Sequence, residues 1–267
     1  MAADPLTAVI DTGTPLVVLS PHLDDAVLSC GALMAHAADR TNVRVATFFT
    51  EAGAPPYTLS GRHYLRLAGR TDAESLYRER RAEDGEVLRR LGVDWVHLGL
   101  TDGLFRRKPT VSGRPREWLR RALPEPSHMY PTYRLHVATG RISPFDAGTL
   151  DQARAVLETL ASAPRTILLA PSGVGRHVDH VLVRTAAELS GHRVVFYSDF
   201  PYNQQHPVDP RFVERNGLTG VEWSRGLAAK AALVRGYRSQ ADALFPGGRI
   251  PEVPEIYLLA GGAPWLS

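Results

Sequence analysis

The sequence predicts an α/β fold in which helices flank a mostly parallel sheet. Two stretches carry this prediction. The apolar run Leu16–Leu19 leads through a polar turn into the helix-like stretch Ala26–Ala35. Thr166–Ala170 leads in the same way into Val178–Leu189. Continuous apolar runs of strand length that alternate with helices are typical of parallel strands buried on both faces, and the carboxyl ends of such strands are where these folds bind ligands.

The elements between these stretches extend the sheet. Val43–Phe49 is predicted to be a second strand, which closes a βαβ unit with a right-handed crossover. The polar stretch Arg78–Gly92 contains a few apolar residues and ends in a glycine, so it is predicted to be a surface helix. Asp94–Leu100 follows as a third strand.

A proline-rich insertion at about residues 104–147 interrupts this alternation. Because long irregular segments in compact domains are usually functional or mobile, and because this one leaves the sheet after Asp102, we expect it to form a wall or lid near the site. Its aromatic residues, Tyr130 and Tyr133 among them, are interpreted as ordinary loop residues. Regular structure returns with predicted helices at 150–160 and 224–236 and predicted strands at 193–197 and 255–260, the last at an edge.

Composition limits the class of protein. The chain has 267 residues and 44% hydrophobic content, and we expect one domain over residues 1–267. No apolar run approaches the roughly eighteen residues of a membrane span. The start, Met1–Pro5, lacks the basic and apolar regions of a secretory signal, so a cytoplasmic location without a membrane partner is expected. Cys30 is the only cysteine, which excludes an internal disulfide and a thiolate metal cluster.

The formal net charge of +3 is mild, but one segment concentrates positive charge. Seven basic residues stand there against the single acid Glu117: Arg106, Arg107, Lys108, Arg114, Arg116, Arg120 and Arg121. One interpretation is a solvated loop and helix face, and the other is attraction of an anionic substrate such as a phosphorylated or nucleotide-linked sugar. No recognised binding motif accompanies the charge, so no nucleic-acid partner is expected. Nothing in the sequence sets the oligomeric state.

The two polar turns share a pattern of histidine and aspartate. Their chemistry-bearing residues are His22, Asp24 and Asp25 in the first turn, and His177, Asp179 and His180 in the second. Residues three apart lie on one face of a helical turn, so each turn can direct two side chains at one point. One interpretation of the first turn is a helix cap. A divalent metal better explains adjacent carboxylates beside an imidazole, with one carboxylate as a ligand and the other free for proton transfer.

Other kinds of site lack their signatures. The turn after Leu16–Leu19 has neither the Gly-x-Gly-x-x-Gly of a dinucleotide site nor the Gly-Lys-Ser/Thr of a phosphate loop. Pro171–Gly175 matches the Gly-x-Ser-x-Gly elbow of serine hydrolases only in part. Histidine and aspartate ligands around an open position are instead typical of zinc acting on a carbonyl group.

These motifs resemble those of the PIG-L/LmbE-like family of zinc-dependent N-acetyl-sugar deacetylases. The family's Pro/Ala-His-Pro-Asp-Asp-Glu motif stands here as Pro21–Ala26, and its His-x-Asp-His motif as His177–His180. Similarity continues at Arg80 with Glu83, at the Asp102–Gly103 turn and at Tyr197–Tyr202. The resemblance extends from about residue 15 to 202 and implies a Rossmann-like sheet with a metal site at the carboxyl ends of its strands.

The resemblance also implies a role for each residue of the two motifs. Zinc, or another divalent metal, would be held by His22, Asp25 and His180. Asp24 would be the general base that activates the zinc-bound water. His177 would stabilise the tetrahedral oxyanion as an imidazolium or protonate the leaving amine.

Three further residues have weaker implied roles. Asp179 would orient His177 or a metal ligand through a hydrogen bond. Arg80 and Asp102 match family positions that contact sugar hydroxyls. Two positions depart from the family motif, because Leu23 stands in place of its proline and Ala26 in place of its acid. Neither change removes a ligand or the base.

The residues and the resemblance together predict an enzyme, a metal-dependent amidohydrolase. It would remove the acetyl group from an N-acetylated amino sugar and give a free amine and acetate. The substrate would be a GlcNAc-type glycoside, a nucleotide sugar or a sugar-bearing natural product. Two alternatives stay open, an amidase acting on a larger sugar-linked amide such as a thiol conjugate, and a sugar-binding module without turnover.

Overall fold

The computed structural model describes residues 4–109 and 123–261 of the chain. Within these residues, seven strands form one sheet. They are β1 (Leu16–Ser20), β2 (Val43–Glu51), β3 (Asp94–Thr101), β4 (Ile167–Pro171), β5 (Arg193–Tyr197), β6 (Leu218–Trp223) and β7 (Glu255–Ala260). The helices are α1 (Pro5–Asp11), α2 (Asp25–Ala37), α3 (Leu59–Leu67), α4 (Ala73–Leu91), α6 (Ala147–Leu160), α7 (Val178–Glu188), α8 (Pro210–Arg215), α9 (Leu227–Val234) and α10 (Arg238–Leu244).

The sheet is mostly parallel, as predicted, with the strand order β3-β2-β1-β4-β5-β7-β6. β1 pairs in parallel with both β2 and β4, so Leu16 lies between Val43 and Ile167. The chain leaves β1 toward one edge and returns at β4 to build the other side, which makes the carboxyl ends of β1 and β4 the topological switch point of the sheet. Both polar turns lie there.

The predicted edge position of residues 255–260 is wrong. β7 lies between β5 and β6 and is antiparallel to both, so β6 is the strand at that edge. β6 was not predicted, because its sequence carries a glycine and polar residues and its burial is incomplete. Its partial exposure is nevertheless typical of an edge strand with one face in solvent.

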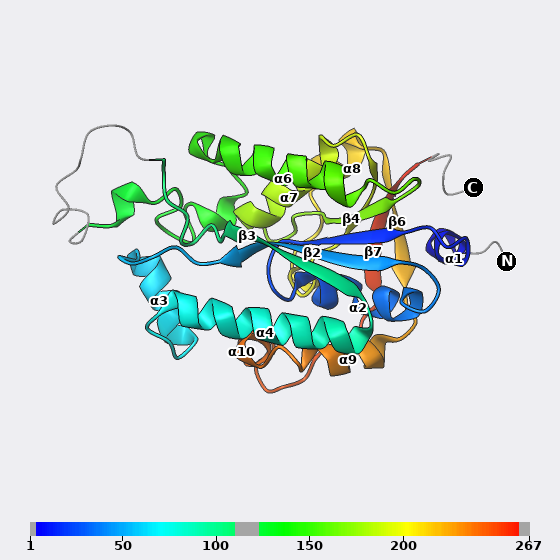
Figure 1. Cartoon of the computed structure of the whole chain (residues 1–267), viewed down its shortest axis with the longest axis horizontal. Coiled ribbons are helices and arrows are strands. Elements are labelled where there is room, and N and C mark those ends of the chain that lie inside the picture. Colours follow the sequence, from blue (N-terminus) through cyan, green and yellow to red (C-terminus); the bar gives the residue numbers. More distant parts are fainter. Residues whose placement is uncertain (1–3, 110–122, 262–267) are drawn as a thin grey trace.

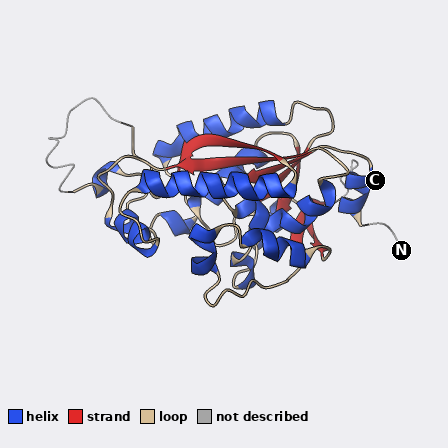
Figure 2. Ribbon diagram, turned by 60° about the horizontal axis from the view of Figure 1, so that its bottom comes forward, coloured by secondary structure: helices blue, strands red, loops and turns tan. Residues whose placement is uncertain are grey.

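Helices cover both faces of the sheet. In Figure 1, α4, α9 and α10 lie below the sheet and α6, α7 and α8 above it, and Figure 2 shows the same layers after rotation. β1 contributes alternate residues to the two cores, with Leu16 and Val18 on the side of α2 and Val17 and Leu19 on the side of α7. Two-sided burial therefore explains the uninterrupted apolar run. None of the described helices combines the length and apolar character needed to cross a membrane.

The predicted helices at 26–35, 78–92, 150–160, 178–189 and 224–236 correspond to α2, α4, α6, α7 and α9. The helices that were not predicted are short, and six to nine residues are too few for a 3.6-residue period to stand out. α3 shows how such a helix forms. The Thr58 side chain accepts a hydrogen bond of 3.0 Å from the amide of Gly61, which caps the helix.

The described part of the proline-rich insertion packs against the switch point. Phe105, Met129 and Tyr130 share a buried cluster with Leu23 from the first polar turn and Val178 from the second. The expectation that this segment lies near the site is therefore confirmed for its described residues. Residues 110–122, which include the predicted basic residues Arg114, Arg116, Arg120 and Arg121, lie outside the described residues.

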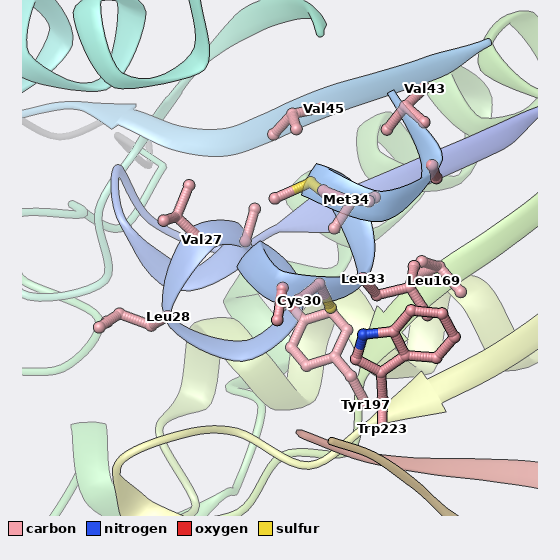
Figure 3. Packing of buried hydrophobic residues seen from close by; sticks show 14 of the residues in the cluster. Val27, Leu28, Cys30, Leu33, Met34, Val43, Val45, Leu169, Tyr197 and Trp223 are labelled. Carbon is pink, nitrogen blue, oxygen red and sulfur yellow. The ribbon is translucent and has the colours of Figure 1, made fainter. Parts of the chain in front are cut away.

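A buried ion pair holds α2, whose first residue is Asp25. The Glu255 carboxylate accepts hydrogen bonds from the amides of Ala32 and Leu33, at 2.8 and 3.0 Å, and lies 3.2 Å from the Lys230 ammonium. Both side chains of the pair are almost completely buried. Nearby, Cys30 and Leu33 of this helix lie close to Tyr197 and Trp223 (Figure 3). The thiol of Cys30 is therefore buried as a packing residue.

We expect Lys230→Met to lower the free energy of unfolding by about 3–5 kcal/mol, because it leaves the Glu255 carboxylate buried without its cation. The double variant Lys230→Met, Glu255→Gln should recover much of this loss, since no charge is then buried. Urea denaturation measures the free energy of unfolding of the single and the double variant. Arg235→Met, an exposed change on the same segment, is the control and should stay within about 0.5 kcal/mol of the wild type. Equal stability of Lys230→Met and the wild type would contradict this account.

Candidate metal centre and active site

Hydrogen bonds between side chains and the backbone fix the turn that follows β1. The Ser20 hydroxyl donates to the carbonyl of His22 at 2.7 Å and accepts from the amide of Ala26 at 3.0 Å. The amide of His22 donates to Asp25 Oδ2 at 2.8 Å. Asp24 occupies the cap position of α2, but its side chain makes no capping hydrogen bond. The helix-cap interpretation of Asp24 is therefore wrong, and its carboxylate is free for another role.

A tight loop brings the second turn to the same point. Gly175 has a φ of +80°, and a Cβ there would come within 2.9 Å of the Tyr202 ring, so only glycine fits. His177 then caps α7, because its Nδ1 accepts a hydrogen bond from the amide of Asp179 at 3.2 Å. This hydrogen bond leaves the proton of a neutral His177 ring on Nε2.

The two turns meet through their side chains. His22 Nδ1 lies 3.2 Å from Asp25 Oδ2, and its Nε2 lies 3.1 Å from Asp179 Oδ2. His180 Nε2 lies 3.3 Å from the same Asp25 oxygen. The rings of His22, His177 and His180 have centroids 4.8–5.4 Å apart. The structure therefore brings the predicted residues of both motifs into one cluster.

Asp199, which the sequence analysis did not select, orients His180. Its Oδ1 lies 2.7 Å from His180 Nδ1, so the opposite ring nitrogen faces Asp25. Its Oδ2 accepts hydrogen bonds from the Ser172 hydroxyl at 3.0 Å and from the amide of Val174 at 2.9 Å. Asp199 thus ties the end of β5 to the loop after β4. Its position directly after a predicted strand was the signal that could have identified it.

Arg106 corrects the prediction of a basic surface segment. Its guanidinium is buried and forms ion pairs with Asp146 and Asp179. It therefore neutralises carboxylates inside the protein and is not available to an anionic substrate. Asp179 also accepts a hydrogen bond of 2.8 Å from the amide of Gly103. Through these contacts Asp179 is held rigidly beside His22, which agrees with the orienting role expected for it.

Burial and opposite charges set the protonation of the cluster. Burial alone would raise the pKa of Asp25, but His180 and His22 hold that pKa well below its usual range. Burial opposes the charge of His180, yet Asp25 and Asp199 raise its pKa to about 10. The pKa of His22 is likewise raised, because hydrogen bonds to Asp179 and Asp25 outweigh its burial. These carboxylates strongly favour positive charge at the centre of the cluster.

The pKa values of Asp24 and His177 shift in the opposite directions to those of Asp25 and of the other two histidines. Burial, with the neighbouring charge of Asp25, raises the pKa of Asp24 to about 7. Burial, with the neighbouring charge of His22, lowers the pKa of His177 well below its usual value. Asp24 can therefore accept and return a proton near neutral pH, while His177 is a neutral ring.

Arg80 and Asp102 also lie at the site. The Arg80 guanidinium stands over the rings of Tyr64 and Tyr77, 5.4 and 5.6 Å from their centroids, and its buried Nε has no hydrogen-bond partner among the described residues. Asp102 accepts hydrogen bonds from the Tyr77 hydroxyl at 2.6 Å and from the amide of Leu104 at 2.8 Å. Their contact with sugar hydroxyls stays a prediction.

A cavity of about 250 Å³ opens onto this cluster. Its floor is formed by the motif residues that line it, together with Arg80 and Asp102: His22, Asp24, Asp25 and His177. Its walls come from α3, α10 and the insertion. Tyr133 lines it, so the interpretation of this tyrosine as an ordinary loop residue is wrong. Tyr130 is buried, and its hydroxyl donates a hydrogen bond to Asp146, so its role is structural.

The donor atoms fit a divalent metal. Ligands at about 2.0–2.1 Å from a tetrahedral zinc ion lie about 3.3 Å apart, which agrees with the separations of 3.2 and 3.3 Å from Asp25 to the two imidazoles. Among the described residues, the sets that bring three ligand atoms within 4.8 Å of one another are His22, His177 and His180, and His22, Asp102 and Asp179. Asp25 is in neither set and lies within ligand distance of His22 and His180 pair by pair. Asp179 is engaged by Arg106 and Gly103, so the second set is the poorer one.

Comparison with known proteins assigns the family. The family model of PIG-L, described as GlcNAc-PI de-N-acetylase, matches residues 17–189. The chain belongs to the PIG-L family. The matched region runs from β1 to the end of α7 and so contains both polar turns.

Several relatives that match this family member are deacetylases. 2'-N-acetylparomamine deacetylase of Streptomyces fradiae is 31% identical over 225 residues, which are 81% of this chain and 66% of that protein. The zinc-inhibited form of teicoplanin deacetylase has a TM-score of 0.70 and 25% identity, over 92% of this chain and 97% of that one. N,N'-diacetylchitobiose deacetylase from Pyrococcus horikoshii, with a TM-score of 0.51 and 13% identity over 96% and 87% of the two chains, shares the fold.

The chain thus spans just under two thirds of the length of the curated relative. The comparisons confirm the predicted family and the predicted fold, and the deacetylases among the relatives are hydrolases that cleave C–N amide bonds. The zinc-inhibited form of the structural neighbour, together with the His/Asp cluster of this chain, indicates a divalent metal.

The contact between Asp199 and His180 gives a direct test of the metal centre. Asp199→Asn should weaken zinc binding about 10- to 100-fold, because such partners fix the orientation and basicity of a ligating histidine. Calorimetric titration of the metal-depleted protein with zinc measures the change. Asp209→Asn is the matched control, since Asp209 is exposed at the start of α8 and asparagine caps a helix equally well. Unchanged zinc affinity in Asp199→Asn would contradict this arrangement.

Proposed function

We propose that the protein removes the N-acetyl group of an N-acetylated amino sugar and releases acetate and the free amine. The observation that supports this most is the position of Asp24. Its carboxylate has no hydrogen-bond partner among the described residues, opens into the cavity and stands beside the cluster of Asp25, His22 and His180. The deacetylase relatives support the reaction class.

In this proposal a divalent metal, zinc being the first candidate, is held by His22, Asp25 and His180. When bound, the metal supplies Lewis-acid chemistry, which lowers the pKa of a water molecule and polarises an amide carbonyl. The chain supplies the anionic environment that binds the cation. Asp199 and Asp179 hold the two imidazoles in place from behind.

Asp24 is the proposed general base. It is buried at the floor of the cavity, and a pKa near 7 lets it take a proton from the attacking water and return one to the amine. Arg80, which lies close enough to lower this pKa, limits how far burial raises it.

His177 is the proposed donor to the oxyanion. The capping hydrogen bond from Asp179 occupies Nδ1, so the neutral ring presents an N–H at Nε2. The sequence-based expectation was an imidazolium, but the lowered pKa of His177 favours this neutral donor. Loss of one such donor typically raises the barrier by about 3–4 kcal/mol.

Replacement of the proposed base tests the reaction. Asp24→Asn should reduce acetate release from N-acetylglucosaminides by about 10²- to 10⁴-fold, because general-base catalysis contributes that much, while the metal content stays that of the wild type. Enzymatic detection of acetate and elemental analysis give the two readouts. Asp39→Asn, on the exposed surface, should leave both unchanged.

Three outcomes would count against the proposal. Full activity in Asp24→Asn would exclude Asp24 as the base. Wild-type hydrolysis of long-chain N-acyl sugars but not of the acetyl compounds would favour the alternative, an amidase acting on larger amides. Sugar binding without any acetate would favour a binding module.

A further inference from the structure

The cavity has two chemically different halves. The floor is polar and consists of the motif residues with Arg80 and Asp102. The outer part is lined by apolar side chains from three separate segments, which we call the apolar mouth: Leu67 and Ala68 at the end of α3, Tyr133 of the insertion, and Ala243 and Leu244 at the end of α10. Neither α3 nor α10 contributes a residue of the two motifs.

The apolar mouth leaves large hydrophobic side chains in solvent. Leu67 is 74% exposed and Tyr133 is 44% exposed. Single exposed apolar side chains are common on protein surfaces, but Leu67 and Tyr133 line the same cavity. Exposed apolar side chains that gather around a ligand site usually mark the place where an apolar part of the ligand binds.

The charges of the lining argue against a phosphate-bearing substrate. Three carboxylates, Asp24, Asp25 and Asp102, face the cavity, and Arg80 is the one lysine or arginine among the described residues that line it. Arg106, at the start of the basic segment, is engaged in buried ion pairs with Asp146 and Asp179. A nucleoside diphosphate in the mouth would therefore meet three carboxylates, with Arg80 as the one arginine or lysine among the described lining residues to offset them.

The floor and the mouth belong to one cavity. Its volume of about 250 Å³ is slightly below the roughly 300–1,000 Å³ of common ligand sites, so floor and mouth together leave little room for two separate ligands. This favours a group at the mouth that is joined to the sugar on the floor.

We propose that the substrate is a glycoside with an uncharged, apolar aglycone, alkyl or aromatic, which packs on Leu67, Tyr133 and Leu244 while the acetamido group lies on the polar floor. This inference rests on the proposed deacetylase function and selects among its substrates. It favours a sugar-bearing apolar compound over a nucleotide sugar.

The experiment compares methyl and octyl N-acetyl-β-glucosaminide, the latter below its critical micelle concentration. In the wild type, kcat/KM for acetate release should be at least about tenfold higher for the octyl compound, mainly through a lower KM, because additional apolar surface is buried. Leu67→Ser should lose most of this preference. Leu189→Ser is the matched control, since Leu189 is 54% exposed at the far end of α7, and it should keep the preference.

The outcomes separate this inference from the proposed function. Hydrolysis of both glycosides with equal kcat/KM, or an unchanged preference in Leu67→Ser, would overturn the apolar mouth and leave the deacetylase function standing. If neither glycoside is hydrolysed, the proposed function fails, and calorimetric binding of the same two compounds tests the mouth by itself. Tighter binding of the octyl compound that is lost in Leu67→Ser supports the mouth, and equal binding overturns it.

Discussion

The parallel pairing of β1 with β4 is the constraint on which the site depends. Because these neighbouring strands end at the same edge of the sheet, the turns after them meet, although their residues lie some 150 positions apart. The helices that follow leave on opposite faces, so α2 presents Asp25 from one side and α7 presents His180 from the other. A metal that links these two turns therefore also links the two layers of the fold.

The cluster also shows how charges are tolerated inside a protein. A carboxylate or imidazolium without a partner is strongly disfavoured there, and each one here has a partner. Arg106 neutralises Asp179, Asp199 holds His180, and Asp25 contacts both His22 and His180. Asp24 is the exception, since its carboxylate faces the cavity without a hydrogen bond. In the proposed mechanism, that difference separates the residues that would bind and orient the metal from the one that would transfer the proton.

The sequence revealed the motif residues because local patterns contain the necessary information. His22 and His180 follow strand-length apolar runs, and their three-residue spacing to Asp25 and His177 is readable without a structure. Arg106 could not be assigned in this way, since its partners are distant in sequence and a basic run indicates solvation rather than burial. For Asp199 the sequence offered only its position directly after a predicted strand. The walls escaped prediction for a related reason. α3 and α10 are short, and Leu67 and Leu244 approach the site only when the chain is folded.

The most direct test of the account is the metal content of the wild type and of Asp25→Ala, measured by elemental analysis together with acetate release from N-acetyl sugars. Because Asp25 lies between His22 and His180, we expect about one divalent metal per wild-type chain. The variant should lose this metal, because removal of one ligand side chain lowers the affinity of the site. Acetate should form only with the wild type. A wild-type protein that takes up no metal, even after zinc is added, would contradict the metal centre on which the proposed function depends.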